Sequence, residues 1–183
     1  MERYFAFLRA INVGGRTVTM SALRGHLQAL GLEKVQTFIA SGNVIFETEC
    51  QDQAALEARI EAHLAQVLGF EVATFVVTGP ELRAIIEHPA FSEEEMDAAQ
   101  AYNIALMKAP LSTEAFARLK ALENEQDGFA SQGRAFYWLC RSKQSQSGFD
   151  NRRFERVARV QGTFRSISSL KRLAKKYELQ DDH

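Results

Sequence analysis

Proline, cysteine and long apolar segments are all scarce in this chain of 183 residues. Its three prolines, Pro80, Pro89 and Pro110, are too few and too scattered to form a proline-rich linker. No apolar run approaches the roughly 20 residues that a membrane helix needs, so we predict no membrane partner. The first residues include the acidic Glu2, and their apolar run ends at Arg9, which is too short for a signal peptide and typical of a first strand.

The two cysteines, Cys50 and Cys140, lie far apart in the sequence and form no CxxC motif. We interpret them as reduced and structural, which favours a cytoplasmic location, with a single disulfide as the less favoured alternative. Apolar residues make up 46% of the chain and charged residues 25%, the usual shares for a globular protein. This composition argues against intrinsic disorder over most of the length.

Charge is unevenly distributed although the net charge is only −1. Residues 1–140 carry 11 basic against 18 acidic side chains, whereas residues 141–176 carry 11 basic side chains against only Asp150 and Glu155. A local excess of this size can mark an anionic partner such as nucleic acid. The alternative is the solvated surface of helices that lean on the acidic first part.

Hydrophobic periodicity in the first half predicts the element order β-α-β-β-α-β. The expected elements are a strand at 4–8, a helix over 20–30, strands at 34–40 and 44–46, a helix over 56–67 and a strand at 70–77. Ser41, Gly42 and Asn43 form the turn between the second and third strands. This order is the split βαβ arrangement of ferredoxin-like folds.

The second half repeats this pattern after a polar, acidic stretch at 90–100. Before that stretch, Thr78 and Glu81 have the spacing of a capping box that begins a short helix, which ends near Pro89. After it, we expect a strand at 102–107, a helix around 116–122, a hairpin of 128–130 with 135–140, and helices around 154–157 and 167–177. We therefore predict an α+β fold of two ferredoxin-like units in tandem, with domains at 1–89 and 90–183.

The loop between the first strand and the first helix is the most suggestive candidate site. It contains Arg9, Asn12, Gly14, Gly15 and Arg16. Adjacent glycines let backbone N–H groups turn toward an anion, and the two arginines are suited to pair with phosphate or carboxylate. The loop matches neither the Walker A motif nor GxGxxG. The alternative is a tight turn that needs glycine for its positive φ angles.

Topology predicts a neighbour for this loop. In a split βαβ unit the first two strands run parallel, so the loop after the first strand and the turn after the second lie at the same end of the sheet. We therefore expect Asn12–Arg16 to lie near Ser41, Gly42 and Asn43 and to form a polar pocket with them. Two unrelated turns are the alternative.

Catalytic and metal-binding patterns are weak in this sequence. The four histidines show no metal-ligand spacing, and no nucleophile–base arrangement can be assembled from the sequence. We predict no metal and no other cofactor. An enzyme that uses the same pocket stays an open alternative, and the oligomeric state is left undetermined.

A nucleic-acid interface is the main alternative to the anion pocket. Arg152, Arg156 and Arg159 share one face of an expected helix, as the spacings of four and three residues require. The aromatic run at 136–138 does not match the RNA-binding RNP1 pattern, and we favour core packing for it.

Two segments of the first half resemble the bacterial domain of unknown function 1697 family. They are Phe7–Gly15, followed by Met20 and Leu23, and Thr37–Phe46. The resemblance covers about the first 50 residues densely and implies two ferredoxin-like units, but it implies no activity. Its motifs fall on the same two loops that the topology brings together.

The C-terminal half follows the family more loosely. Its signature there is similar to Thr-Thr-Arg-Asn-Trp, which corresponds to residues 163–167 of this chain. Thr163 and Arg165 agree, whereas Ser166 and Ile167 replace the usual Asn and Trp, which puts any ligand site built on those two residues in doubt. Because Arg165 agrees with the family signature, we add it to the predicted ligand-binding residues.

Overall fold

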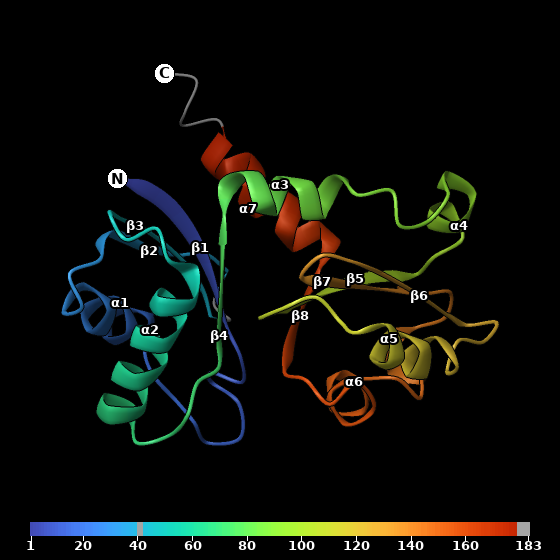
Figure 1. Ribbon diagram of the computed structural model, residues 1–183, viewed down its shortest axis with the longest axis horizontal. Coiled ribbons are helices and arrows are strands. Elements are labelled where there is room, and N and C mark those ends of the chain that lie inside the picture. Colours follow the sequence, from blue (N-terminus) through green and yellow to red (C-terminus); the bar gives the residue numbers. More distant parts are fainter. Residues whose placement is uncertain (40–41, 179–183) are drawn as a thin grey trace. The chain divides into compact units, whose positions relative to one another are not determined.

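The computed structural model describes residues 1–39 and 42–178, and it divides into two compact units, Met1–Arg83 and Ala84–His183. Within the described residues there are two four-stranded antiparallel sheets and seven α-helices, which confirms the mixed α+β class (Figure 1). Each unit is described below by itself. Among these residues, no helix combines the length and the apolar character needed to cross a membrane.

The first unit contains one sheet with the strand order β2-β3-β1-β4. Its elements are β1 (Glu2–Leu8), α1 (Met20–Gln28), β2 (Glu33–Thr37), β3 (Asn43–Thr48), α2 (Gln53–Leu68) and β4 (Thr74–Thr78), and α3 (Gly79–Glu87) follows. β1 runs antiparallel to both β3 and β4, and β2 runs antiparallel to β3. β1 and β2 therefore point the same way, as the sequence predicted.

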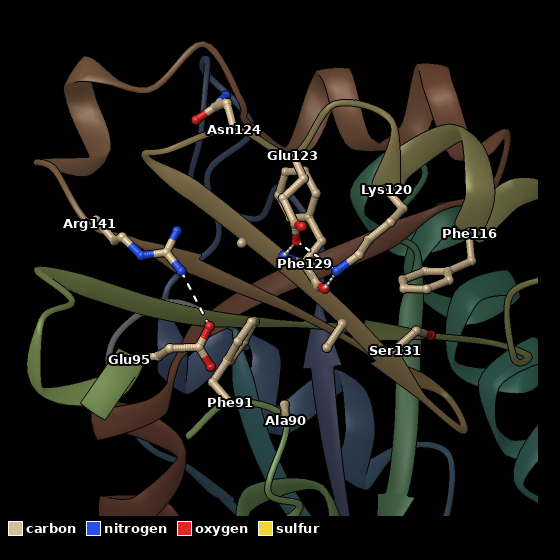
Figure 2. Close-up of a pocket in the computed structure, with 12 residues that line it drawn as sticks. Ala90, Phe91, Glu95, Phe116, Lys120, Glu123, Asn124, Phe129, Ser131 and Arg141 are labelled. Atoms are coloured by element: carbon tan, nitrogen blue, oxygen red, sulfur yellow. Dashed lines mark hydrogen bonds and ion pairs between the residues drawn. The ribbon is translucent and has the colours of Figure 1, made fainter. Parts of the chain in front are cut away.

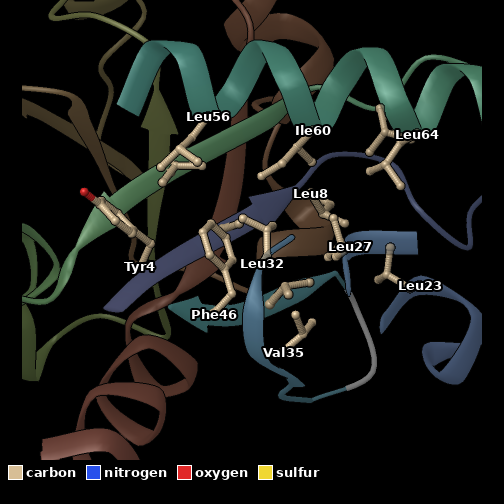
Figure 3. Close-up of a cluster of buried hydrophobic side chains, with 14 of the residues drawn as sticks. Tyr4, Leu8, Leu23, Leu27, Leu32, Val35, Phe46, Leu56, Ile60 and Leu64 are labelled. Carbon is tan, nitrogen blue, oxygen red and sulfur yellow. The ribbon is translucent and has the colours of Figure 1, made fainter. Parts of the chain in front are cut away.

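Alternation along the strands fills the core of the first unit (Figure 3). On β1, Tyr4 and Leu8 face α1 and α2, and α2 returns Leu56, Ile60 and Leu64 toward the sheet. These side chains recur every three or four residues, the spacing that places them on one face of a helix. The other β1 residues, such as Phe7, are buried as well, so both faces of this strand are covered.

Local signals set the ends of these helices. The side chains of Thr19 and Asp52 accept hydrogen bonds from backbone N–H groups in the first turns of α1 and α2. Gly69 ends α2 with φ of 80°, a left-handed conformation that costs glycine little. The predicted capping box is confirmed, because Thr78 and Glu81 each accept from the other's backbone N–H, at 3.2 and 3.1 Å.

The second unit contains one sheet with the strand order β6-β7-β5-β8. Its elements are α4 (Glu93–Asp97), β5 (Ala101–Met107), α5 (Thr113–Lys120), β6 (Asp127–Gln132), β7 (Ala135–Cys140), a 3₁₀ turn (Gln144–Gln146), α6 (Asn151–Ala158), β8 (Gly162–Ser166) and α7 (Ile167–Glu178). β6 and β7 form the predicted hairpin, and Gly133 at its turn has φ of 54°. β8 pairs with β5 at the far edge from β6.

Aromatic rings dominate the core of the second unit. Phe136 contacts Phe129 and Phe154, with ring centroids 5.4 and 5.0 Å apart, and Trp138 packs edge-on against Phe149 at 5.0 Å. The run at 136–138 is fully buried, so the favoured core interpretation is correct and these rings offer no exposed stacking surface for bases.

Three strand predictions need correction. β2 ends at Thr37, whereas the strand was expected to reach residue 40, which lies outside the described residues. β4 begins at Thr74 rather than at residue 70, because its ladder with β1 starts there and Ala73 adds only a backbone bond to Arg9. β8 was not predicted at all. It has five residues and only one large apolar side chain, Phe164, so it lacks a readable alternation.

Candidate functional site

The predicted anion loop forms a tight, exposed turn after β1. The backbone N–H of Asn12 donates to the carbonyl of Arg16 at 2.7 Å, and the N–H of Arg16 donates to the carbonyl of Val13 at 3.1 Å. Gly14 and Gly15 take φ angles of 60° and 82° between them. The turn therefore requires its glycines for conformation, whatever else they do.

Asn12 closes the loop through its side chain. Its Oδ1 accepts a hydrogen bond of 2.8 Å from the backbone N–H of Val18, six residues on, and its own φ is 59°. Asparagine tolerates this left-handed conformation better than most residues. In this geometry Asn12 shapes the loop, and its side-chain oxygen is already engaged.

The β2–β3 turn lies against the end of β1 and the first residues of this loop, at Leu8 and Ile11. The N–H of Leu8 donates to the carbonyl of Gly42 at 2.8 Å. A Cβ atom at Gly42 would lie 2.8 Å from Cγ2 of Ile11 and 3.0 Å from the carbonyl oxygen of Leu8. Asn43 is 4% exposed and donates from Nδ2 to the carbonyl of Phe38, so its amide fixes the turn. Ser41 lies outside the described residues.

The three arginines of the predicted set have different surroundings. Arg9 is half-buried, and its backbone N–H donates to the carbonyl of Ala73. Arg16 is exposed, with its guanidinium 5.7 Å from the centre of the Phe70 ring, within the range of a cation–π contact. Arg165 belongs to the second unit, so its position relative to this loop is not described.

Arg165 and Thr163, the two residues that agree with the family signature, are bonded to each other. Nη1 of Arg165 donates to Oγ1 of Thr163 at 2.7 Å and to the carbonyl of Phe164 at 3.0 Å. Burial lowers the pKa of Arg165 to about 10, so it still carries its charge at neutral pH.

The basic face of α6 is exposed. Arg152, Arg156 and Arg159 are all solvent-exposed, and within the described part of the chain none of them forms a salt bridge. Arg159 ends the helix with φ of 60°. These three charges are therefore available to an external anion.

A cavity of about 490 Å³ lies beside the edge strand β6, and the sequence did not predict it (Figure 2). We call it the edge pocket and define it by six of its lining residues: Phe91, Phe116, Lys120, Glu123, Gly128 and Arg141. Its walls come from the chain before α4 and α4 itself, from α5 and the residues after it, from β6, and from Arg141, which follows β7. All of them belong to the second unit.

Lys120 and Glu123 bind the outer edge of β6 at the pocket wall. Glu123 accepts from the backbone N–H of Phe129 at 2.8 Å, and Nζ of Lys120 donates to the carbonyl of Phe129 at 3.0 Å and to Glu123 at 2.8 Å (Figure 2). Burial alone would raise the pKa of Glu123. The bonds from Lys120 and Phe129, with the charges of Lys120 and Arg141, outweigh burial and lower it.

Among the residues that the structure describes, no group of three or more His, Cys, Asp or Glu side chains is placed to hold a metal ion. Cys50 and Cys140 are both free thiols.

Comparison with known proteins gives a family and a fold. No curated protein matches the sequence. A solved structure described as that of conserved bacterial protein SP0830 from Streptococcus pneumoniae is similar, with a TM-score of 0.77 at 23% identity, and the match covers 97% of this chain and 99% of that chain. This similarity concerns the fold alone. A family model described as protein of unknown function (DUF1697) matches residues 1–137. The chain therefore belongs to the DUF1697 family.

Proposed function

We propose that this protein binds a small phosphate- or carboxylate-bearing ligand at the β1–α1 loop. The observation that carries the proposal is a pair of exposed backbone N–H groups beside a cation. Gly14 and Gly15 form no hydrogen bond within the described residues, and Arg16 follows them directly. Successive N–H groups in left-handed turns make a concave site that suits an anion.

Fewer residues contact the ligand in this proposal than in the ligand-binding set predicted from the sequence. Asn12 and Asn43 use their side chains to shape the loop and the turn, and Gly42 packs against Ile11. They would hold the site in shape while Gly14, Gly15 and Arg16 contact the ligand. Contributions from Arg9, Ser41 and Arg165 remain part of the proposal.

Calorimetric titration with inorganic phosphate, pyrophosphate and citrate tests this site. Loss of a charge-assisted hydrogen bond should weaken binding at least about tenfold in Arg16→Gln. The matched control is Arg59→Gln, which removes an equal charge from α2, where Arg59 donates to the carbonyl of Leu30. Equal affinities in the wild type and in Arg16→Gln would contradict the proposal.

We also propose that each unit is ferredoxin-like and that the protein is cytoplasmic. The order second-third-first-fourth within each antiparallel sheet, with helices after the first and third strands, supports the ferredoxin-like description. The two free thiols support a reducing location.

Nucleic-acid binding through segment 141–176 is the second candidate function. It is favoured by the exposed face of Arg152, Arg156 and Arg159. Fluorescence anisotropy with a labelled oligonucleotide should then show affinity that falls steeply between about 50 and about 200 mM salt. Each removed arginine should reduce the slope of log affinity against log salt by about 0.7–0.9. Affinity independent of salt would contradict this candidate, and an enzyme acting at the β1–α1 loop remains a third.

A further inference from the structure

Arg141 is the side chain of the edge pocket with the most unused hydrogen-bond donors. Its Nη2 lies 3.5 Å from Oε1 of Glu95 (Figure 2). Its Nη1 lies 3.4 Å from the carbonyl of Glu125. Good bonds between a cation and a carboxylate are about 2.7–2.9 Å long. The guanidinium has five N–H donors, so two long contacts leave most of its capacity unused within the described residues.

The carboxylates of the pocket are more firmly engaged. Glu123 accepts 2.8 Å bonds from both Phe129 and Lys120. Glu95 accepts a 2.9 Å bond from the N–H of Ser92 in the capping box of α4. The least engaged charged group of the pocket is therefore the guanidinium of Arg141, and a cation favours an anion as its partner.

Apolar surface lies directly beside this cation. A Cβ atom at Gly128 would lie 3.3 Å from Cε1 of Phe91 and 3.6 Å from Nη2 of Arg141, so the ring and the guanidinium both cover the bare backbone there. Phe116, half-buried on α5, forms another part of the wall. Binding pockets for small organic molecules combine apolar walls with a few placed polar groups in this way.

The edge strand is closed to an added peptide strand at Asp127 and Phe129, two of its outward-facing positions. The outward N–H and C=O of Phe129 are bonded to Glu123 and Lys120, and those of Asp127 are bonded to Asn124. Strand addition needs these groups free. A small molecule is therefore the better fit for the cavity.

We propose that the edge pocket binds a small organic anion, in which a carboxylate or phosphate pairs with Arg141 and an aromatic or aliphatic body packs against Phe91 and Phe116. This site is independent of the β1–α1 loop and lies in the other unit. A fork of N–H donors can bind either head group in bidentate fashion.

Calorimetric titration of the full chain carrying Arg16→Gln, in which the β1–α1 loop site is weakened, tests the proposal with phenyl phosphate and 3-phenylpropionate. Inorganic phosphate and benzyl alcohol are the probes that lack one half of the ligand. We expect at least one of the two-part probes to bind, and each half alone to bind at least about tenfold more weakly. Binding of only one two-part probe would identify the head group. Inorganic phosphate binding as tightly as phenyl phosphate would overturn the proposal, as would failure of both two-part probes to bind at millimolar concentrations.

Variants locate the binding. Arg141→Gln should weaken it about tenfold or more, Arg141→Lys less, and Phe116→Ala should weaken the two-part probes alone. The control Arg24→Gln removes another half-buried arginine that donates to a side-chain oxygen, here Thr37 of the first unit, and should leave affinity unchanged. In the unaltered protein, the amide NMR signals of Gly128 and Ala130 should shift on titration. Affinity that is unchanged in Arg141→Gln, or binding that does not shift these amide signals, would overturn the assignment.

Discussion

The two units share one strand order but differ in the connection after their first strand. In the first unit the chain runs from Arg9 to Thr19 between β1 and α1, whereas in the second only Lys108 to Ser112 separate β5 from α5. The longer connection holds the Gly14–Gly15 turn, and the candidate site of the second unit is the cavity beside β6. The sheet and its helices can therefore stay constant while candidate binding surfaces arise at different places around them.

Their cores differ in kind as well. The first is filled mostly by aliphatic side chains, such as Leu27 and Ile60, whereas the second is a network of rings, one of which is bonded to the buried carboxylate of Asp127. Oδ1 of Asp127 accepts from Nε1 of Trp138 at 2.8 Å, and the hydroxyl of Ser147 donates to the same carboxylate at 2.9 Å. The second core thus combines ring packing with directional bonds to a buried carboxylate.

Breaking this network should have the largest effect. Asp127→Ala would leave the buried N–H of Trp138 without its acceptor, so we expect a loss of about 3 kcal/mol in the free energy of unfolding. The first residue of the equivalent strand in the first unit, Glu33, is exposed, and Glu33→Ala should change it by less than about 0.5 kcal/mol. Urea denaturation followed by circular dichroism measures both. Equal losses would mean that the Asp127 network adds no stability.

The hairpin glycines give the next contrast. Gly42 has φ of 78° and packs against Ile11, whereas Gly133, in the equivalent turn of the second unit, has φ of 54° and open space around it. Gly133→Ala should cost about 1–2 kcal/mol for its left-handed backbone. Gly42→Ala adds the clash and should cost about 2–3 kcal/mol.

Urea denaturation followed by circular dichroism checks both glycine variants. If Gly42→Ala were no more destabilising than Gly133→Ala, the contact between the β2–β3 turn and the β1–α1 loop would not be as tight as the structure describes.

Local patterns explain which parts of this fold were predictable. The spacing of the apolar residues alone predicts the burial of Tyr4–Leu8 and of the helix with Leu56, Ile60 and Leu64. The parallel direction of β1 and β2 followed from the element order. β8 has no such pattern, since its place depends on pairing with β5.

Candidate sites were less predictable, because the type of a residue does not show whether it holds a loop in shape or contacts a ligand. The sequence placed Asn12 and Asn43 in a ligand site, yet the hydrogen bonds to Val18 and Phe38 that fix their amides depend on three-dimensional closure. The edge pocket escaped prediction for a related reason. Phe91 and Arg141 lie 50 residues apart, and neither belongs to a motif.

Removing the bonds that close the β6 edge should have a moderate effect. The double variant Lys120→Ala, Glu123→Ala frees the outward N–H and C=O of Phe129, so we expect a loss of about 1–2 kcal/mol and concentration-dependent self-association. Lys34→Ala on the first unit's edge strand β2 is the control, because its ammonium pairs with Glu47 and not with the strand backbone. Sedimentation at several concentrations gives the readout, and a double variant that stays as dispersed as Lys34→Ala would show that these bonds do not protect the edge.

The smallest effect is expected for Glu123→Gln, which removes the charge at the β6 edge but keeps a side-chain oxygen that can accept a hydrogen bond. Because the pKa of Glu123 is lowered in the folded protein, its ionised form adds stability above the unfolded value of about 4.3, and that contribution disappears as pH falls through the lower folded value. For a partly exposed pair it should amount to about 0.5 kcal/mol. Glu123→Gln should therefore be less stable than the wild type near neutral pH and equally stable in acid. A difference that persists unchanged into acid would mean that the carboxylate's geometry, rather than its charge, holds Phe129.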